Sequence, residues 1–195
     1  MIPVHRPYLG EDELRAIARV LESRWVGMGA VTREFEEKLR EYLGARHVIA
    51  VSSGSAALHV ALHALDLQPG DEVIVPSLTF VASVQAIVAV GATPVFCEIC
   101  ADTLNMDMSD ALGRVTARTK VIMPVHYGGV ACDMNELLPA ARDREIRVVE
   151  DAAHAIGSAY QNRRVGTLGD ITCFSFDAIK NITCAGGGAV TTDQD

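Results

Sequence analysis

Short apolar runs alternate with helical segments along most of this 195-residue chain. The runs are continuously apolar instead of alternating in polarity, which is typical of strands that are covered on both faces. This order predicts an α/β domain with three layers, α/β/α, around a mainly parallel sheet. The expected strands are HVIAV, EVIVP, TPVFCEI, KVIMPV, IRVVED, ITCFSF and GAVTT, and the clearest helices between them are SAALHVALHAL, TFVASVQAIVAV and DMNELLPAARD.

The composition limits the classes of partner. Hydrophobic residues make up 49% of the chain and charged residues 22%, which is the balance of a soluble globular protein. The formal net charge of -8 argues against nucleic acid or an anionic membrane as the main partner, because both favour basic patches. The chain has neither an apolar stretch long enough to span a bilayer nor a signal-like start, so we expect a cytoplasmic protein.

The five cysteines raise the question of a metal or redox site, since Cys97 and Cys100 have the C-x-x-C spacing. No second pair and no histidine cluster completes a set of four ligands. Most of the cysteines lie in apolar runs, where free thiols behave as small hydrophobic groups. The sequence therefore favours free thiols, and we expect no metal.

Ligands of open parallel sheets bind beyond the carboxyl ends of the strands, so the residues that follow each strand are the first candidates. Gly54 and Ser55 follow HVIAV at the start of a helix, where free N–H groups and the helix dipole attract an anion. An ordinary serine N-cap is the alternative. Phe80 follows EVIVP, either as an aromatic face for a ligand or as a core residue.

Two charged residues also follow strands at the carboxyl edge of the expected sheet. Asp151 follows the buried strand IRVVE, and a buried carboxylate requires hydrogen bonds or an opposite charge. Lys180 follows ITCFSF without other basic residues nearby, and its alternative is a solvated loop position. An anion cradle, an aromatic face, an acid and a lysine together match the phosphate, ring, pyridine nitrogen and aldehyde of pyridoxal 5'-phosphate (PLP).

The same residues carry a family resemblance. The motifs SSGSAALHVAL, PGDEVIVPSLTFVASVQAIVAVGATPVF, VEDAAHAIGS, VGTLGDITCFSF and KNIT follow one another as in the DegT/DnrJ/EryC1/StrS family of PLP-dependent sugar aminotransferases. The chain resembles the N-terminal portion of that family, whose large domain has the fold of type I PLP-dependent transferases.

The resemblance implies a role for each candidate residue. Lys180 is expected to form the covalent link to the cofactor aldehyde and to transfer protons, and Asp151 to pair with the pyridine nitrogen. Phe80 is expected to stack on the ring, and His154 to contact the ring or its phenolic oxygen. The phosphate is assigned to Gly54, Ser55 and Ser175.

The chain also departs from the family pattern. Ala185, Gly186, Gly187 and Gly188 stand where relatives commonly read Gly-Glu-Gly-Gly. Family members continue well beyond the position of Asp195 into a smaller C-terminal domain, which we expect to be absent here. We therefore expect an N-terminal helical segment at 1–25 and a PLP-binding large domain at 26–195 that is incomplete at its C-terminus. An exposed strand edge is expected after GAVTT, and the chain alone is not expected to turn over substrate.

The resulting hypothesis is an aminotransferase that moves an amino group, with glutamate as the expected donor, to a keto-sugar that is expected to be nucleotide-linked. By the resemblance the protein is a homodimer. One alternative is a PLP-dependent sugar dehydratase, but relatives of that kind carry histidine at the position of Lys180. Others are a non-catalytic binding or regulatory protein and an inactive fragment. His126, in VHYGG, is interpreted as a structural histidine in preference to a substrate contact.

Overall fold

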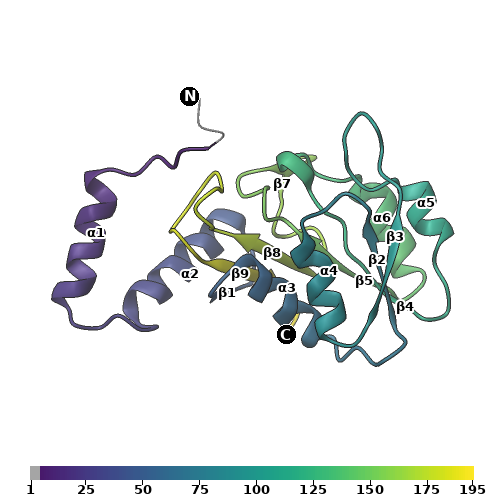
Figure 1. Cartoon of the computed structure of the whole chain (residues 1–195), viewed down its shortest axis with the longest axis horizontal. Helices are drawn as coiled ribbons and strands as arrows, with labels where there is room; N and C mark the ends of the chain where they lie inside the picture. The colour runs from purple at the N-terminus through teal and green to yellow at the C-terminus, as the bar shows by residue number, and fades with distance from the viewer. Residues whose placement is uncertain (1–4) are drawn as a thin grey trace.

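The computed structural model describes residues 5–195 and contains the expected central sheet (Figure 1). Its seven strands have the order β1-β9-β8-β5-β4-β2-β3. Five strands, from β8 to β3, pair in parallel, and β9 runs antiparallel to both of its neighbours. The mainly parallel sheet is thus confirmed. The strands are β1 (His47–Val51), β2 (Glu72–Pro76), β3 (Thr93–Cys97), β4 (Thr119–Ile122), β5 (Arg147–Asp151), β8 (Ile171–Ser175) and β9 (Gly188–Thr192).

Helices cover both faces of the sheet and make two separate cores. The first core joins strand residues such as Val73 and Val149 to α3 and α4, and the second joins Ile74 and Val148 to α2, α5 and α6. Neighbouring strand residues thus enter opposite cores, which explains why the runs are continuously apolar. The helices are α1 (Glu11–Glu22), α2 (Ala30–Leu43), α3 (Gly54–His63), α4 (Val81–Ala89), α5 (Met108–Gly113) and α6 (Met134–Arg142).

The remaining elements are short. A 3-10 turn, η1 (Tyr127–Gly129), follows β4, and a hairpin of β6 (Ala159–Tyr160) and β7 (Arg163–Arg164) follows β5. None of the helices in residues 5–195 is long and apolar enough to cross a membrane. All five cysteines are free thiols, and no group of His, Cys, Asp or Glu side chains in the described part of the chain is arranged to hold a metal ion.

The place of β9 corrects one expectation. The segment GAVTT does not leave an exposed edge, because β9 pairs with β8 on one side and with β1 on the other. The edges of the sheet are instead β1 and β3. Strand order depends on pairing between distant segments, in this case His47 with Thr192, and apolar runs alone do not encode it.

The N-terminal helix stands apart from the rest of the fold. α1 extends away from the body of the molecule (Figure 1), and none of its residues is buried. Its apolar stripe of Leu14, Ile17 and Leu21 is exposed. α1 lies within the expected segment 1–25, of which residues 1–4 lie outside the described part of the chain.

Candidate active site

A cavity of about 360 Å³ lies at the carboxyl ends of the parallel strands. It is formed by the loops that follow β1, β2, β4, β5 and β8, which is where ligands of open α/β sheets are expected. All seven residues proposed from the sequence line this cavity, namely Gly54, Ser55, Phe80, Asp151, His154, Ser175 and Lys180.

The start of α3, where the sequence predicts an anion cradle, lines this cavity. Ser53 is the N-cap, and its hydroxyl oxygen accepts a hydrogen bond from the N–H of Ala56 at 3.1 Å, so the ordinary capping role is present as well. The amides of Gly54 and Ser55 belong to the first helical turn, where N–H groups lack acceptors within the helix. A Cβ atom on Gly54 would lie only 2.7 Å from Cβ of Ser175. The glycine thus allows the helix start to approach the end of β8 closely.

Asp151 and Asp177 both line the cavity, and Asp151 is the buried one, only 4% exposed. Its Oδ1 accepts a hydrogen bond from the N–H of Ala153 at 3.1 Å, and its Oδ2 accepts one from the hydroxyl of Ser83 at 2.7 Å. A carboxylate has about four acceptor positions, so these two donors leave capacity for a further donor from the cavity. A cationic N–H group is the partner that best suits a buried carboxylate.

Lys180 lies in a short turn beyond β8. Its backbone N–H donates to the carbonyl of Asp177 at 3.0 Å. The Asp177 carboxylate accepts a further hydrogen bond from the N–H of Ile179 at 3.2 Å, which fixes the turn. His5, near the N-terminus, contacts the carbonyl of Ala178 through Nε2 at 2.7 Å. The lysine is half-buried and lines the cavity, so it is not a fully solvated loop residue.

Two rings border the cavity. Phe80 is 69% exposed at the N-cap position of α4, so its alternative as a core residue is wrong for this chain. His154 accepts a hydrogen bond at Nδ1 from the N–H of Gly128 at 3.3 Å. Desolvation and then the positive charge of Lys180 lower the pKa of His154 below its ordinary value. Its imidazole is therefore neutral at pH 7, with the ring proton on Nε2.

Several residues of the site were not identified from the sequence. Thr79 and Tyr127 line the cavity, and Ser83 lies behind Asp151. Tyr127 lies in the loop that follows β4, just before two glycines. Because ligands bind beyond the carboxyl ends of parallel strands, this position could have been identified from the sequence. Ser83 lies inside an apolar helix, and nothing in its local sequence distinguishes it from a solvent-exposed serine.

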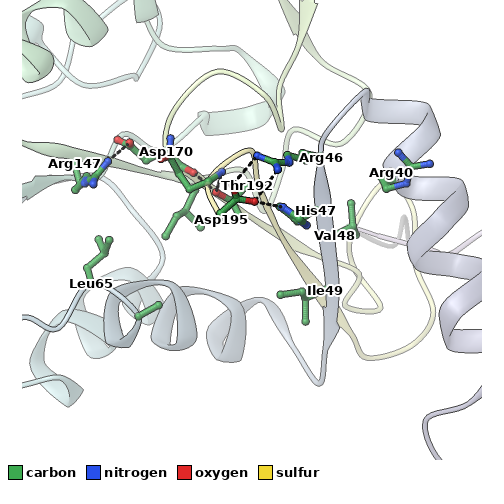
Figure 2. A pocket seen from close by; sticks show the side chains of 13 residues that line it. Arg40, Arg46, His47, Val48, Ile49, Leu65, Arg147, Asp170, Thr192 and Asp195 are labelled. Atoms are coloured by element: carbon green, nitrogen blue, oxygen red, sulfur yellow. Dashed lines mark hydrogen bonds and ion pairs between the residues drawn. The ribbon is translucent and has the colours of Figure 1, made fainter.

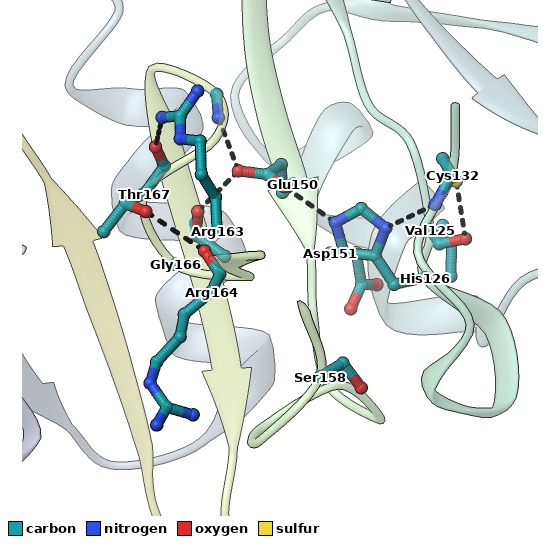
Figure 3. A network of polar contacts seen from close by, with 12 residues as sticks. Val125, His126, Cys132, Glu150, Asp151, Ser158, Arg163, Arg164, Gly166 and Thr167 are labelled. Carbon is teal, nitrogen blue, oxygen red and sulfur yellow. Dashed lines mark hydrogen bonds and ion pairs between the residues drawn. The ribbon is translucent and has the colours of Figure 1, made fainter. Parts of the chain in front are cut away.

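His126 is a structural residue, as the sequence favoured. It is fully buried, and its Nε2 lies 2.7 Å from Oε2 of Glu150 (Figure 3). Its Nδ1 accepts the N–H of Cys132 at 3.1 Å, so the proton it donates to Glu150 is on Nε2. The N–H of Gly169 and the hydroxyl of Thr172 donate to the other carboxylate oxygen, both at 2.7 Å. This network ties the loop after β4 to β5 and β8.

A larger cavity, of about 780 Å³, lies at the opposite, amino ends of β5 and β8 (Figure 2). Its charged groups already have partners, since Arg46 pairs with Asp195 at 2.8 Å and Arg147 with Asp170 at 2.9 Å. None of the site residues proposed from the sequence lines it. The smaller cavity is therefore the candidate active site.

Known proteins resemble the chain along its whole length. An uncharacterized protein of Methanocaldococcus jannaschii is 45% identical over 194 residues, and the spore coat polysaccharide biosynthesis protein SpsC of Bacillus subtilis is 43% identical over 194 residues. Both alignments cover 100% of this chain and 50% of the relative. The chain thus spans about half the length of these relatives.

Solved structures give the same result. The PLP-form of Spr1654 from Streptococcus pneumoniae is 38% identical, with a TM-score of 0.95 over 100% of this chain and 53% of that one. PseC of Helicobacter pylori, an aminotransferase involved in the biosynthesis of pseudoaminic acid, is 32% identical, with a TM-score of 0.95 over 99% of this chain and 52% of that one. The model of the DegT/DnrJ/EryC1/StrS aminotransferase family matches residues 7–195. The chain therefore belongs to the DegT/DnrJ/EryC1/StrS aminotransferase family.

Proposed function

We propose that the chain carries the cofactor site of a PLP-dependent sugar aminotransferase. The observation that carries this proposal is the presence of Lys180, Asp151 and the start of α3 on one cavity of about 360 Å³. A lysine amine, a buried acid and a helix N-terminus are the three groups that the aldehyde, pyridine nitrogen and phosphate of PLP require.

The donor set of the cavity fits this cofactor. The amides of Gly54 and Ser55 and the hydroxyl of Ser175 would hold the phosphate, and the missing side chain at Gly54 leaves room for that approach. Phe80 would cover the ring, and the neutral His154 would contact it. Bound PLP supplies an electron sink and a temporary carrier for the amino group.

The roles of the two charged residues follow from their chemistry. Asp151 is acceptor-only when ionised, so it would hold a proton on the pyridine nitrogen. The Nζ atom of Lys180 would accept a proton from the substrate carbon and return it elsewhere, as a general base and then a general acid. Lysine is also the residue able to bind the cofactor aldehyde covalently and reversibly.

The proposal also names the class of amino acceptor and the amino donor. The relatives named for spore coat polysaccharide and pseudoaminic acid biosynthesis support a sugar as amino acceptor. We propose a nucleotide-linked keto-sugar, with glutamate as the donor, on the basis of the family resemblance. Among the described residues that line the cavity, Lys180 is the one lysine or arginine. Groups that bind the carboxylates of a donor would then come from a second copy of the chain in a homodimer, or from further residues of a longer protein.

The test is borohydride reduction of the chain with bound PLP, followed by mass mapping of the peptides. We expect one pyridoxyl group, attached to Lys180. The chain has two other lysines, Lys38 and Lys120, which serve as internal controls. A Lys180→Arg variant keeps the positive charge and should lose the label. A label on Lys38 or Lys120, or an unchanged label in the variant, would disprove the assignment.

A further inference from the structure

Two hydroxyl groups, linked by hydrogen bonds, hold Asp151 on the side away from the cavity. The hydroxyl of Ser83 lies 2.7 Å from Oδ2 of Asp151, and the hydroxyl of Thr79 lies 2.7 Å from that of Ser83. Ser83 and Asp151 are 68 positions apart in the sequence, so this contact joins α4 to the end of β5. Ser83 is fully buried, whereas Thr79 borders the cavity.

The carboxylate of Asp151 determines which hydroxyl group donates in each of these two hydrogen bonds. An ionised carboxylate only accepts hydrogen bonds, so Ser83 donates its single proton to Asp151. The oxygen of Ser83 is then free to accept, and Thr79 donates to it. Hydrogen bonds that point the same way strengthen one another in a buried setting. Ser83 also belongs to the first turn of α4, where the helix dipole favours negative charge nearby.

A purely structural role explains these contacts less well. The neighbouring buried positions of α4, Ala82 and Ala86, are filled by small apolar side chains that need no partner. A buried hydroxyl lowers stability unless it is hydrogen-bonded, and the partners of Ser83 here are Thr79 and Asp151. An alanine at this position would need no partner, whereas the serine hydroxyl holds the Asp151 carboxylate in place.

We propose that Ser83, supported by Thr79, is a positioning residue that aims Asp151 into the cavity and keeps it ionised. This inference rests on the proposed function, because the ionised carboxylate matters through the protonated pyridine nitrogen of PLP. Without the hydroxyl of Ser83, Asp151 retains one donor, the N–H of Ala153, and its charge is less stabilised. The pyridine nitrogen then holds its proton less firmly.

The test uses the chain reconstituted with PLP that is labelled with ¹⁵N in the pyridine ring. The ¹⁵N chemical shift reports protonation of the ring nitrogen without any turnover. In Ser83→Ala we expect the signal to move toward the unprotonated position, because Asp151 loses one of its two donors. In Thr79→Val, which leaves Ser83 in place, we expect a smaller shift in the same direction.

The matched control is Thr172→Val. Thr172 is also buried and also donates to a carboxylate at 2.7 Å, but its acceptor is Glu150, in the network around His126. The control should lose stability and keep the wild-type ¹⁵N signal.

A wild-type ¹⁵N signal in a folded Ser83→Ala variant would overturn the inference and leave the proposed function standing. If Ser83→Ala does not fold, a wild-type signal in Thr79→Val would overturn it. Failure of the wild-type chain to bind PLP would instead overturn the proposed function, and this inference with it.

Discussion

The close packing of β9 on the loop between β1 and α3 can be tested at Gly188. It is the first residue of β9, and it lies against the loop that leads into α3. A Cβ atom added there would lie 2.4 Å from the carbonyl oxygen of Ser53 and 2.8 Å from the backbone nitrogen of Gly54. Both of those atoms are backbone, so no side-chain rotation relieves the overlap. Gly188→Ala must therefore displace either β9 or the start of the anion cradle.

The size of the effect follows from the overlap. Overpacking of a tight interior typically lowers the free energy of unfolding by about 1–3 kcal/mol. A chain of this length loses roughly 2–4 °C in melting temperature per kcal/mol, so we expect a decrease of about 2–12 °C. PLP binding should weaken as well, because the displaced residues include Gly54.

Gly186→Ala is the matched control, two positions earlier. A Cβ atom on Gly186 meets no other atom within 4 Å, and its φ is not in the left-handed region. That substitution should raise the free energy of unfolding by about 0.4–1 kcal/mol through a less flexible unfolded chain. The assay is thermal and urea unfolding of both variants without cofactor, and then PLP titration. Equal stability of the two variants would refute the packing argument.

Three further outcomes are expected. Asp151→Asn, made in a form of the protein completed by the partner copy or further residues that the substrates require, should retain PLP binding and slow amine transfer by several orders of magnitude in single-turnover kinetics, whereas near wild-type rates would make Asp151 structural only. Iodoacetamide at pH 8 should label the exposed Cys184 well before the buried Cys97 and Cys173, and the reverse order by peptide mapping would contradict the fold. Burial raises the pKa of Cys97 to about 12, so the folded thiol keeps a proton that the unfolded chain loses above about pH 9. Stability should therefore fall from pH 9 toward pH 12, less steeply in Cys97→Ala, and equal slopes in urea unfolding would exclude this cause.

The sequence predicted the architecture well because its main signals are local. Continuous apolar runs mark strands that are covered on both faces, and Gly44, with φ at +75°, ends α2 where the apolar stripe stops. Gly54, Ser55, Phe80, Asp151 and Lys180 followed from one general rule about the carboxyl ends of parallel strands, whereas Ser175 and the role of His154 came from the family resemblance. Residues as far apart as Gly54 and Lys180 could thus be assigned to one cavity before any contact was known.

The features that the sequence did not predict depend on contacts between distant segments. Ser83 becomes a buried partner of Asp151 only when the first turn of α4 meets the end of β5, and nothing in the local sequence marks a serine at a helix start for that role. Ser83 looks exposed in the sequence and is buried, whereas Phe80 looks like a core residue because of its size. Its position at the N-cap of α4 leaves it exposed. The pairing of β9 between β8 and β1 is equally invisible in a list of apolar runs.

That pairing has a consequence for how the protein is made. β1 is translated early, but its partner in the sheet is β9, and the backbone of Arg46 bonds to Asp193 at a separation of 147 positions. Contacts of such high sequence separation form late, because loop closure must come first. During synthesis β1 and β8 thus present unpaired edges until Gly188–Thr192 has left the ribosome. The start of α3 directly follows β1, so the candidate active site should form as one of the last steps of folding.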